Sequence, residues 1–273
     1  MSTKENRGLE EGRNPKGQYS PRRHEGSGLC SSPEVVVLTQ KVFAETVGTY
    51  FLIFIGCGTF VVDKRYGSII TFPGMCVAWG LIIMVMVYSV GHISGAHLNP
   101  SVTITFAIFR QFPYKQVPLY IAAQLLGSIL ASVTLYMLFE VEQDNFFGTV
   151  PKGSNVRSLV LEMIISFLLM FVISGVATDN RSTGELAGIA IGMTILINVL
   201  LAGPVSGASM NPARSLGPAI VMNQYKGIWI YLVGPTVGTI LGGFAYNLIR
   251  FTDKPLLELT QSSMLLRSLT RQR

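Results

Sequence analysis

A short polar phrase occurs twice in this chain, each time between long apolar runs. Residues 94–101 have the sequence Ser-Gly-Ala-His-Leu-Asn-Pro-Ser, and residues 206–213 have the sequence Ser-Gly-Ala-Ser-Met-Asn-Pro-Ala. The two Asn-Pro pairs begin at Asn99 and Asn211, an offset of 112. Polar residues are costly in a membrane interior and usually functional there. The repetition therefore predicts that two halves of the chain build one shared site at membrane depth.

The composition agrees with a membrane protein. Hydrophobic residues make up 49% of the chain and charged residues only 13%, about half the charge of a soluble domain. The net charge of +6 does not indicate nucleic-acid binding, because the charged residues lie mostly in the tails. Three cysteines, at Cys30, Cys57 and Cys76, imply no disulfide framework.

Six apolar stretches have about the length of a membrane-spanning helix. They cover residues 42–62, 73–90, 117–139, 159–177, 186–202 and 228–249. Two further apolar segments, 99–109 and 211–222, are too short to cross. Each begins with Asn-Pro, where proline suits the first helical position and asparagine suits the N-cap. They are expected to be re-entrant half-helices whose irregular entry is buried or lines a wet cavity.

The duplication extends beyond the two boxes. Gly80 and Gly192 share the offset of 112, and Glu45 and Glu162 lie in the first span of each half. Three spans per half is an odd number, so the second half must be inverted, and its shared site then lies near the midplane. The sequence predicts an all-α membrane protein with six transmembrane helices and two re-entrant half-helices in an inverted three-helix repeat.

The expected domain organisation follows from these spans. Residues 1–41 are poor in apolar clusters and are expected to form a disordered cytoplasmic tail. The channel domain covers 42–250, with repeat one at 42–139 and repeat two at 159–250, and a second cytoplasmic tail covers 251–273. With both termini cytoplasmic, 15 of the 21 Lys and Arg residues fall inside, which agrees with the positive-inside rule. Both the plasma membrane and an internal membrane are compatible with this sequence.

The chemistry expected at the centre favours neutral solutes. Two half-helix N-termini that face each other carry partial positive charge, and the amides of Asn99 and Asn211 add donors. Such a centre repels cations and orients water against proton relay. Backbone carbonyls along the two loops supply acceptors. The residues expected to present them are Gly95, Ala96, His97, Gly207 and Ser209.

Other polar residues have two interpretations. Glu45 and Glu162 could form a proton-relay pair, but their symmetric placement favours a role in holding the backbone of the re-entrant loops. His92 and His97 lie five residues apart on an irregular segment, a poor spacing for a metal, so His97 is expected to anchor its loop. The sequence suggests no metal or cofactor.

The paired boxes, with Asn-Pro-Ala-Arg-Ser at 211–215, resemble those of the aquaporin superfamily of major intrinsic proteins over about residues 40–252. Residues 91–97, 177–181 and 250–256 are similar to the plant nodulin-26-like intrinsic proteins. The resemblance implies a homotetramer and a narrow filter at Trp79, Val199, Ala208 and Arg214, as in the water- and glycerol-permeable subgroup.

The filter residues suit that subgroup. Val199 and Ala208 leave room for a carbon backbone, Trp79 gives an apolar wall, and Arg214 donates to hydroxyls. The backbone carbonyls before Asn211 are expected to solvate the Arg214 guanidinium. The chain departs from the family pattern at Ser101, where the first box usually ends in Ala, and at Ser215, where bacterial glycerol facilitators usually carry Asp.

We therefore expect a passive channel, not an enzyme, for water and small uncharged solutes such as glycerol, with metalloid acids, lactic acid, ammonia and peroxide as further candidates. An ion-coupled secondary transporter is the alternative, but it would need coupling-ion ligands at the midplane. A junction protein with a vestigial pore would not need Trp79, Arg214 and both asparagines. Membrane lipid is the expected surrounding, and a kinase is a candidate partner at the tail. The candidate phosphorylation sites are Ser262, Ser263, Ser268 and Thr270.

Overall fold

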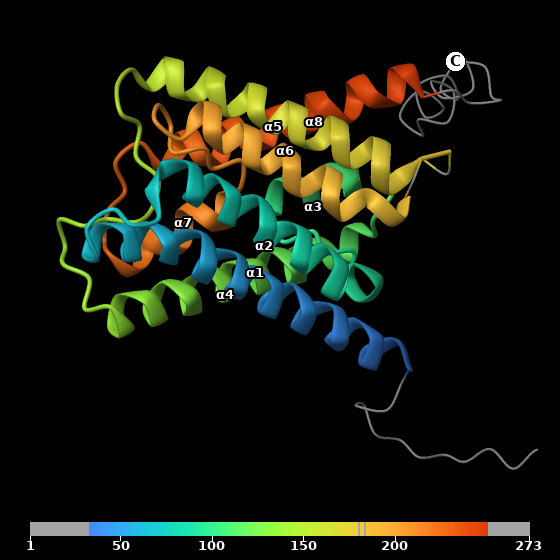
Figure 1. Cartoon of the computed structure of the whole chain (residues 1–273). Helices are drawn as coiled ribbons and strands as arrows, with labels where there is room; N and C mark the ends of the chain where they lie inside the picture. Colours follow the sequence, from blue (N-terminus) through green and yellow to red (C-terminus); the bar gives the residue numbers. More distant parts are fainter. Residues whose placement is uncertain (1–32, 180, 183, 251–273) are drawn as a thin grey trace, which may run out of the picture.

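The computed structural model describes residues 33–179, 181–182 and 184–250, and these residues form helices and no strands. Six of the helices are long and apolar enough to cross a membrane, and two are short (Figure 1). The helices are α1 (Pro33–Arg65), α2 (Thr71–Ser94), α3 (Pro100–Ile108), α4 (Val117–Leu138), α5 (Asn155–Thr178), α6 (Ala187–Ala202), α7 (Pro212–Val221) and α8 (Ile228–Ile249). The predicted fold class is confirmed.

The long helices extend beyond the apolar stretches that predicted them. α1 begins at Pro33, so residues 33–41, expected in the disordered tail, are helical. Proline suits the first turn of a helix, and Glu34 beside it complements the helix dipole. The apolar pattern marks only the part of a helix inside hydrocarbon, whereas the backbone continues into the polar interface.

The two halves meet through a pair of glycines. α2 packs against α6, and a Cβ on Gly80 would lie 2.8 Å from the carbonyl oxygen of Gly192. A Cβ on Gly192 would lie 2.6 Å from that of Gly80. Small residues permit such close approach between membrane helices. Since the two glycines share the offset of the boxes, equivalent positions of the halves touch each other, as they do at a twofold axis.

The half-helices interlock the repeats. α3, from the first half, packs against α8 of the second, whereas α7 packs mainly against α4 of the first. Within each half, α1 packs against α4 and α5 packs against α8. α1 begins and α8 ends at the same end of the bundle, called here the terminal end; the opposite end is called the distal end (Figure 1).

Candidate functional site

Each Asn-Pro box begins a half-helix in the same way. Asn99 is the N-cap of α3, and its Oδ1 accepts from the Ser101 N–H at 2.9 Å. Asn211 is the N-cap of α7, and its Oδ1 accepts from the Ala213 N–H at 2.9 Å. A capped helix start is what the Asn-Pro pattern predicts. Both side chains are thereby fixed relative to their helices.

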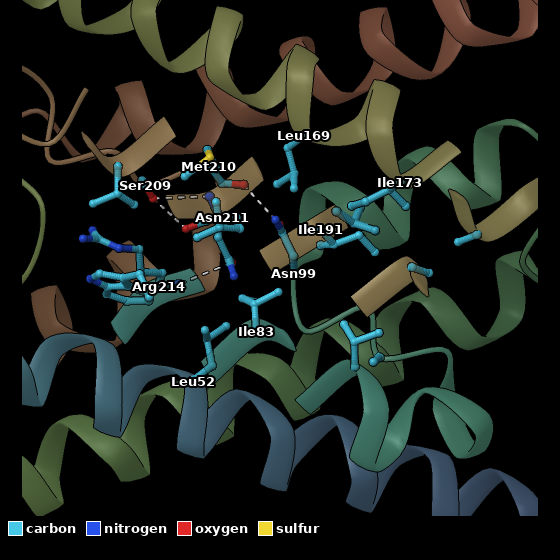
Figure 2. Close-up of a pocket in the computed structure, with 18 of the residues that line it drawn as sticks. Leu52, Ile83, Asn99, Leu169, Ile173, Ile191, Ser209, Met210, Asn211 and Arg214 are labelled. Atoms are coloured by element: carbon cyan, nitrogen blue, oxygen red, sulfur yellow. Dashed lines mark hydrogen bonds between the residues drawn. The ribbon is translucent and has the colours of Figure 1, made fainter. Parts of the chain in front are cut away.

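The two boxes are also bonded to each other. The Nδ2 of Asn99 donates to the carbonyl of Met210 at 2.7 Å, and the Nδ2 of Asn211 donates to the carbonyl of Leu98 at 2.8 Å. A carboxamide has two N–H donors, so each asparagine keeps one that no described residue accepts. Both asparagines line the same cavity (Figure 2). The centre therefore offers two fixed donors to a solute.

The loops before the boxes share an unusual backbone. Three residues in each loop have positive φ, and the angles match between the loops to within about five degrees. They are Gly95 (90°), Ala96 (46°) and Leu98 (51°) in the first loop and Gly207 (85°), Ala208 (45°) and Met210 (53°) in the second. For residues other than glycine this conformation costs on the order of 1–3 kcal/mol each. The surrounding structure must hold these loops in place.

Two buried carboxylates do so. Glu45 accepts through one oxygen from the Ser94 hydroxyl and the His97 N–H, at 2.7 and 2.9 Å. Its other oxygen accepts from the Leu98 N–H and the Gln124 amide, at 2.7 and 2.8 Å.

Glu162 makes three of these four bonds in the second half, where the bond from Gln124 has no counterpart among the residues described. It accepts from the Ser206 hydroxyl at 2.6 Å and from the N–H groups of Ser209 and Met210, both at 2.8 Å. Both side chains are fully buried and point at loop backbone. These hydrogen bonds use both oxygens of each carboxylate on the loops, which leaves little capacity for a proton relay.

Sequence reasoning missed a further symmetric pair. The hydroxyl of Tyr120 donates to the carbonyl of Ser94 at 2.8 Å, and that of Tyr231 donates to the carbonyl of Ser206 at 2.6 Å. Both tyrosines are fully buried. Their offset in sequence matches the repeat to within one residue, which is the signal that could have identified them.

Three cavities follow one another along the bundle. The distal vestibule, about 490 Å³, is lined by residues such as Cys57, Phe72 and Lys152. The terminal vestibule, about 520 Å³, is lined by His97, Gln111 and Glu185 among others. Between them lies the channel cavity, with about 110 Å³ available to the centres of water molecules. A single water needs roughly 10–15 Å³ of such space, so this cavity has room for a short single file of water molecules.

The lining of the channel cavity is mostly apolar. Figure 2 shows Ile173 and Ile191 on one side, Arg214 on the other, and the two asparagines between them. Of the loop residues expected to present carbonyls, Gly95, Ala96 and Ser209 line the channel cavity. Gly207 lines the distal vestibule and His97 the terminal vestibule.

The four residues of the expected filter lie together. Trp79, Val199, Ala208 and Arg214 all line the channel cavity, and all but Ala208 also line the distal vestibule. They therefore stand where the wide vestibule passes into the narrow channel. The Arg214 guanidinium carbon lies 4.8 Å from the centre of the Trp79 ring, a cation–π contact.

The surroundings of Arg214 differ from expectation. Its side chain is only 8% exposed, yet its Nε and Nη1 have no hydrogen-bond partner among the residues described. The loop carbonyls expected to solvate it are partly engaged elsewhere: Ser206 O accepts from Tyr231, and Met210 O accepts from Asn99. In the part of the chain that the structure describes, no acceptor bonds the Nε or Nη1 of Arg214 and no carboxylate forms an ion pair with the guanidinium.

His97 is held by a polar contact and three aromatic contacts. Its Nδ1 lies 3.1 Å from the Thr103 hydroxyl, and its ring packs against Phe106, Phe112 and Tyr120. His92 is exposed. The candidate phosphorylation sites at 262, 263, 268 and 270, and Cys30, lie outside the described residues.

Comparison with known proteins identifies the family. A family model described as major intrinsic protein matches residues 32–246. The chain belongs to this family. Probable aquaporin NIP4-2 of Arabidopsis thaliana is 69% identical over 242 residues, which cover 89% of this chain and 86% of that protein. Nodulin-26 of Glycine max is 61% identical over 232 residues, with 85% and 86% covered.

A solved structure extends the comparison to three dimensions. The aquaglyceroporin from Plasmodium falciparum matches with a TM-score of 0.72 at 26% identity, over 81% of this chain and 99% of that one. The resemblance to plant nodulin-26-like aquaporins is thus confirmed. The protein is an integral, multi-pass membrane channel that passively conducts water and small uncharged solutes, and it is not an enzyme. Nothing in these comparisons supports an ion-coupled transporter.

Proposed function

We propose that this channel conducts water and glycerol and selects them at a filter formed by Trp79, Val199, Ala208 and Arg214. The observation that carries the proposal is the pairing at the filter of a buried, unneutralised guanidinium with an indole face. A polyol presents hydroxyls along one edge and C–H groups along the other. Arg214 suits the first edge and Trp79 the second, because buried donors favour solutes that supply the missing acceptors.

The centre would act on charge. The two remaining amide N–H groups of Asn99 and Asn211, together with two half-helix N-termini, favour an oxygen acceptor and disfavour a cation. A water held there by its oxygen cannot pass a proton along the file. We therefore assign exclusion of protons and cations jointly to this centre and to Arg214. The Glu45 and Glu162 carboxylates serve as loop anchors in this proposal.

The test uses the full-length protein in proteoliposomes. Permeability to water, glycerol, urea, lactic acid and boric acid is measured for the parent and for Trp79→Ala and Ala208→Phe. We expect Ala208→Phe to reduce glycerol flux more than water flux, and Trp79→Ala to admit urea. Ile197→Ala, on the exposed side of the same helix as Val199, is the matched control. An unchanged glycerol-to-water ratio in both filter variants would mean that selection occurs elsewhere.

Topology and assembly complete the proposal. The excess of Lys and Arg in the tails and in the loops at the terminal end favours a cytoplasmic location for both termini, in the plasma membrane or an internal membrane. The family resemblance favours a homotetramer, and the serines of the C-terminal tail are candidate kinase substrates. Protease protection of each tail in sealed vesicles tests the orientation; cleavage from the outside would reverse it.

A further inference from the structure

A row of hydroxyl groups joins α3 to α8. The Ser101 hydroxyl lies 3.0 Å from that of Thr236, and the Thr105 hydroxyl donates to that of Thr239, also at 3.0 Å. The one hydrogen of the Thr239 hydroxyl has two carbonyl acceptors in reach, that of Thr236 at 3.1 Å and that of Ser101 at 3.3 Å. Ser101, Thr105 and Thr239 are fully buried. The first half-helix is therefore bonded through side chains to the long helix beside it.

The second half-helix lacks this row. Ala213 takes the place of Ser101 in the repeat and Gly217 that of Thr105. Only one side-chain bond joins α7 to α4 in the part of the chain described, from the Ser128 hydroxyl to the carbonyl of Ala213 at 2.6 Å. A Cβ on Gly217 would lie 2.1 Å from that same hydroxyl. The Ser215 hydroxyl of α7 bonds instead to the hydroxyls of Thr149 and Ser209, which lie outside α4. Against the long helix beside it, α7 therefore has close packing at Gly217 where α3 has a hydroxyl, and the two half-helices are fixed to their long neighbours in different ways.

The position of Ser101 links the hydroxyl row to the pore. Its hydroxyl is directed to α8, and its side chain does not line the channel cavity. Its backbone N–H, however, donates to the Oδ1 of Asn99. The same carboxamide donates to the carbonyl of Met210 and keeps one N–H for the cavity. A shift of Ser101 therefore turns the carboxamide of Asn99.

We propose that Ser101 is a positioning residue, which with Thr236 holds the first turn of α3 so that the free N–H of Asn99 stays directed at the solute. The inference rests on the proposed function, in which that N–H orients water against proton relay. It also explains the serine of the first box without giving it contact with solute. The Ser101 hydroxyl fixes the first box, whereas close packing of α7 against α4 fixes the second.

The experiment compares Ser101→Ala, Thr236→Val and the double variant in proteoliposomes. Proton leak and glycerol flux are measured per folded channel. Each single variant should raise the ratio of proton leak to glycerol flux by about threefold, the factor that corresponds to one average side-chain hydrogen bond between membrane helices. The double variant should be no leakier than the worse single variant, because both substitutions remove the same bond. Thr236→Ser, which keeps the hydroxyl, should have the same ratio of proton leak to glycerol flux as the parent.

Ser132→Ala is the matched control. Its hydroxyl is equally buried but bonds within its own helix, to Ser128 O at 2.8 Å, so its removal should leave the ratio unchanged. A parent ratio in Ser101→Ala, or additive effects of the two single variants, would overturn the inference.

Asn99→Ala separates this inference from the proposed function. If Asn99→Ala leaks protons and Ser101→Ala does not, only the positioning role fails. If Asn99→Ala itself stays tight to protons, the proposed role of the centre fails.

Discussion

At the scale of single residues, we expect Arg214 to be the decisive charge. It is buried where the distal vestibule narrows into the channel cavity, and no carboxylate of the described residues forms an ion pair with it, so its potential should act on whatever enters. At a separation of about 8 Å and an effective dielectric constant of about 20, a unit charge repels another by about 2 kcal/mol. Arg214→Val should therefore raise sodium leak by roughly thirtyfold while glycerol still passes. Arg214→Lys keeps the charge but loses the planar fork, so its effect should be smaller.

The measurement is sodium and proton leak in proteoliposomes, with glycerol flux as the folding control. A valine variant that conducts glycerol normally and stays as tight to ions as the parent would refute the role assigned to this guanidinium.

Asn211 is the second residue whose chemistry can be tested alone. Asn211→Asp loses the donor to the carbonyl of Leu98 and places a carboxylate at two helix N-termini. We expect lower glycerol flux and weaker cation exclusion, because the negative charge offsets the positive potential of the centre. Asn223→Asp, the same substitution on the exposed segment after α7, is the control. Normal flux and no cation leak in a folded Asn211→Asp channel would contradict a central role.

At the scale of elements, the re-entrant loops depend on their carboxylates. In Glu162→Gln the new amide would face at least one loop N–H, most directly that of Met210, and two donors cannot satisfy each other. A buried unsatisfied donor costs roughly 1–3 kcal/mol. We expect a lower melting temperature in detergent and a lower glycerol flux.

Glu142→Gln, at an exposed position that lines none of the three cavities, should change neither quantity. Glu45→Gln should behave like Glu162→Gln, because the two carboxylates make equivalent bonds to their loops. A Glu162→Gln channel with the parent's stability and flux, but altered proton movement, would revive the relay interpretation.

The connection between α5 and α6 is the second element with a testable anchor. Asp179 accepts from Arg181 at 2.6 and 2.9 Å and from the Tyr246 hydroxyl at 2.9 Å, and Arg250 lies 3.9 Å away. The hydrogen bonds from Arg181 hold the pKa of this carboxyl well below its ordinary value. Asp179 thus joins the end of α5 to the end of α8 at the terminal end of the bundle.

The pH dependence of this anchor follows from the sign of the shift. A carboxyl with a lowered folded-state pKa stabilises the protein fully above its unfolded pKa, about 3.9, and loses that effect as the pH falls toward the folded-state value. Asp179→Asn should therefore have a lower melting temperature than the parent. The difference between the two melting temperatures should be constant between pH 5 and 8 and should shrink below about pH 4. A difference that stays constant to pH 3 would show that the charge of Asp179 is not involved.

At the scale of the whole molecule, much of the architecture could be predicted from sequence. The six spans, the half-helices and the inverted repeat follow from the lengths of the apolar stretches and from the duplicated phrase. Lipid hydrocarbon leaves few structures in which all backbone N–H and C=O groups are hydrogen-bonded. The residues expected at the filter come together at one constriction. Glu45 and Glu162, which the sequence places symmetrically in the two halves, both accept from loop N–H groups, so their role as loop anchors stays a prediction.

The parts that sequence did not predict depend on side-chain partners. The helical segment 33–41 lies outside the apolar pattern, because that pattern marks only the residues inside the hydrocarbon core and not the full length of a helix. The surroundings of Arg214 could not be predicted, because two of the loop carbonyls, those of Ser206 and Met210, accept from Tyr231 and Asn99, which lie far away in the sequence. The bond of Ser101 to Thr236 joins residues 135 positions apart, and no local pattern identifies such a pair.

The bonds between the two boxes have a consequence for how the chain is made. Asn99 donates to a carbonyl 111 residues further along the chain. At about 5–20 residues per second, a ribosome needs roughly 5 to 20 s to supply that acceptor. During this interval the first box has emerged without its partner, and its loop cannot take up its final form. We expect the first half of the nascent channel to wait, partly inserted, until translation of the second half completes both boxes together.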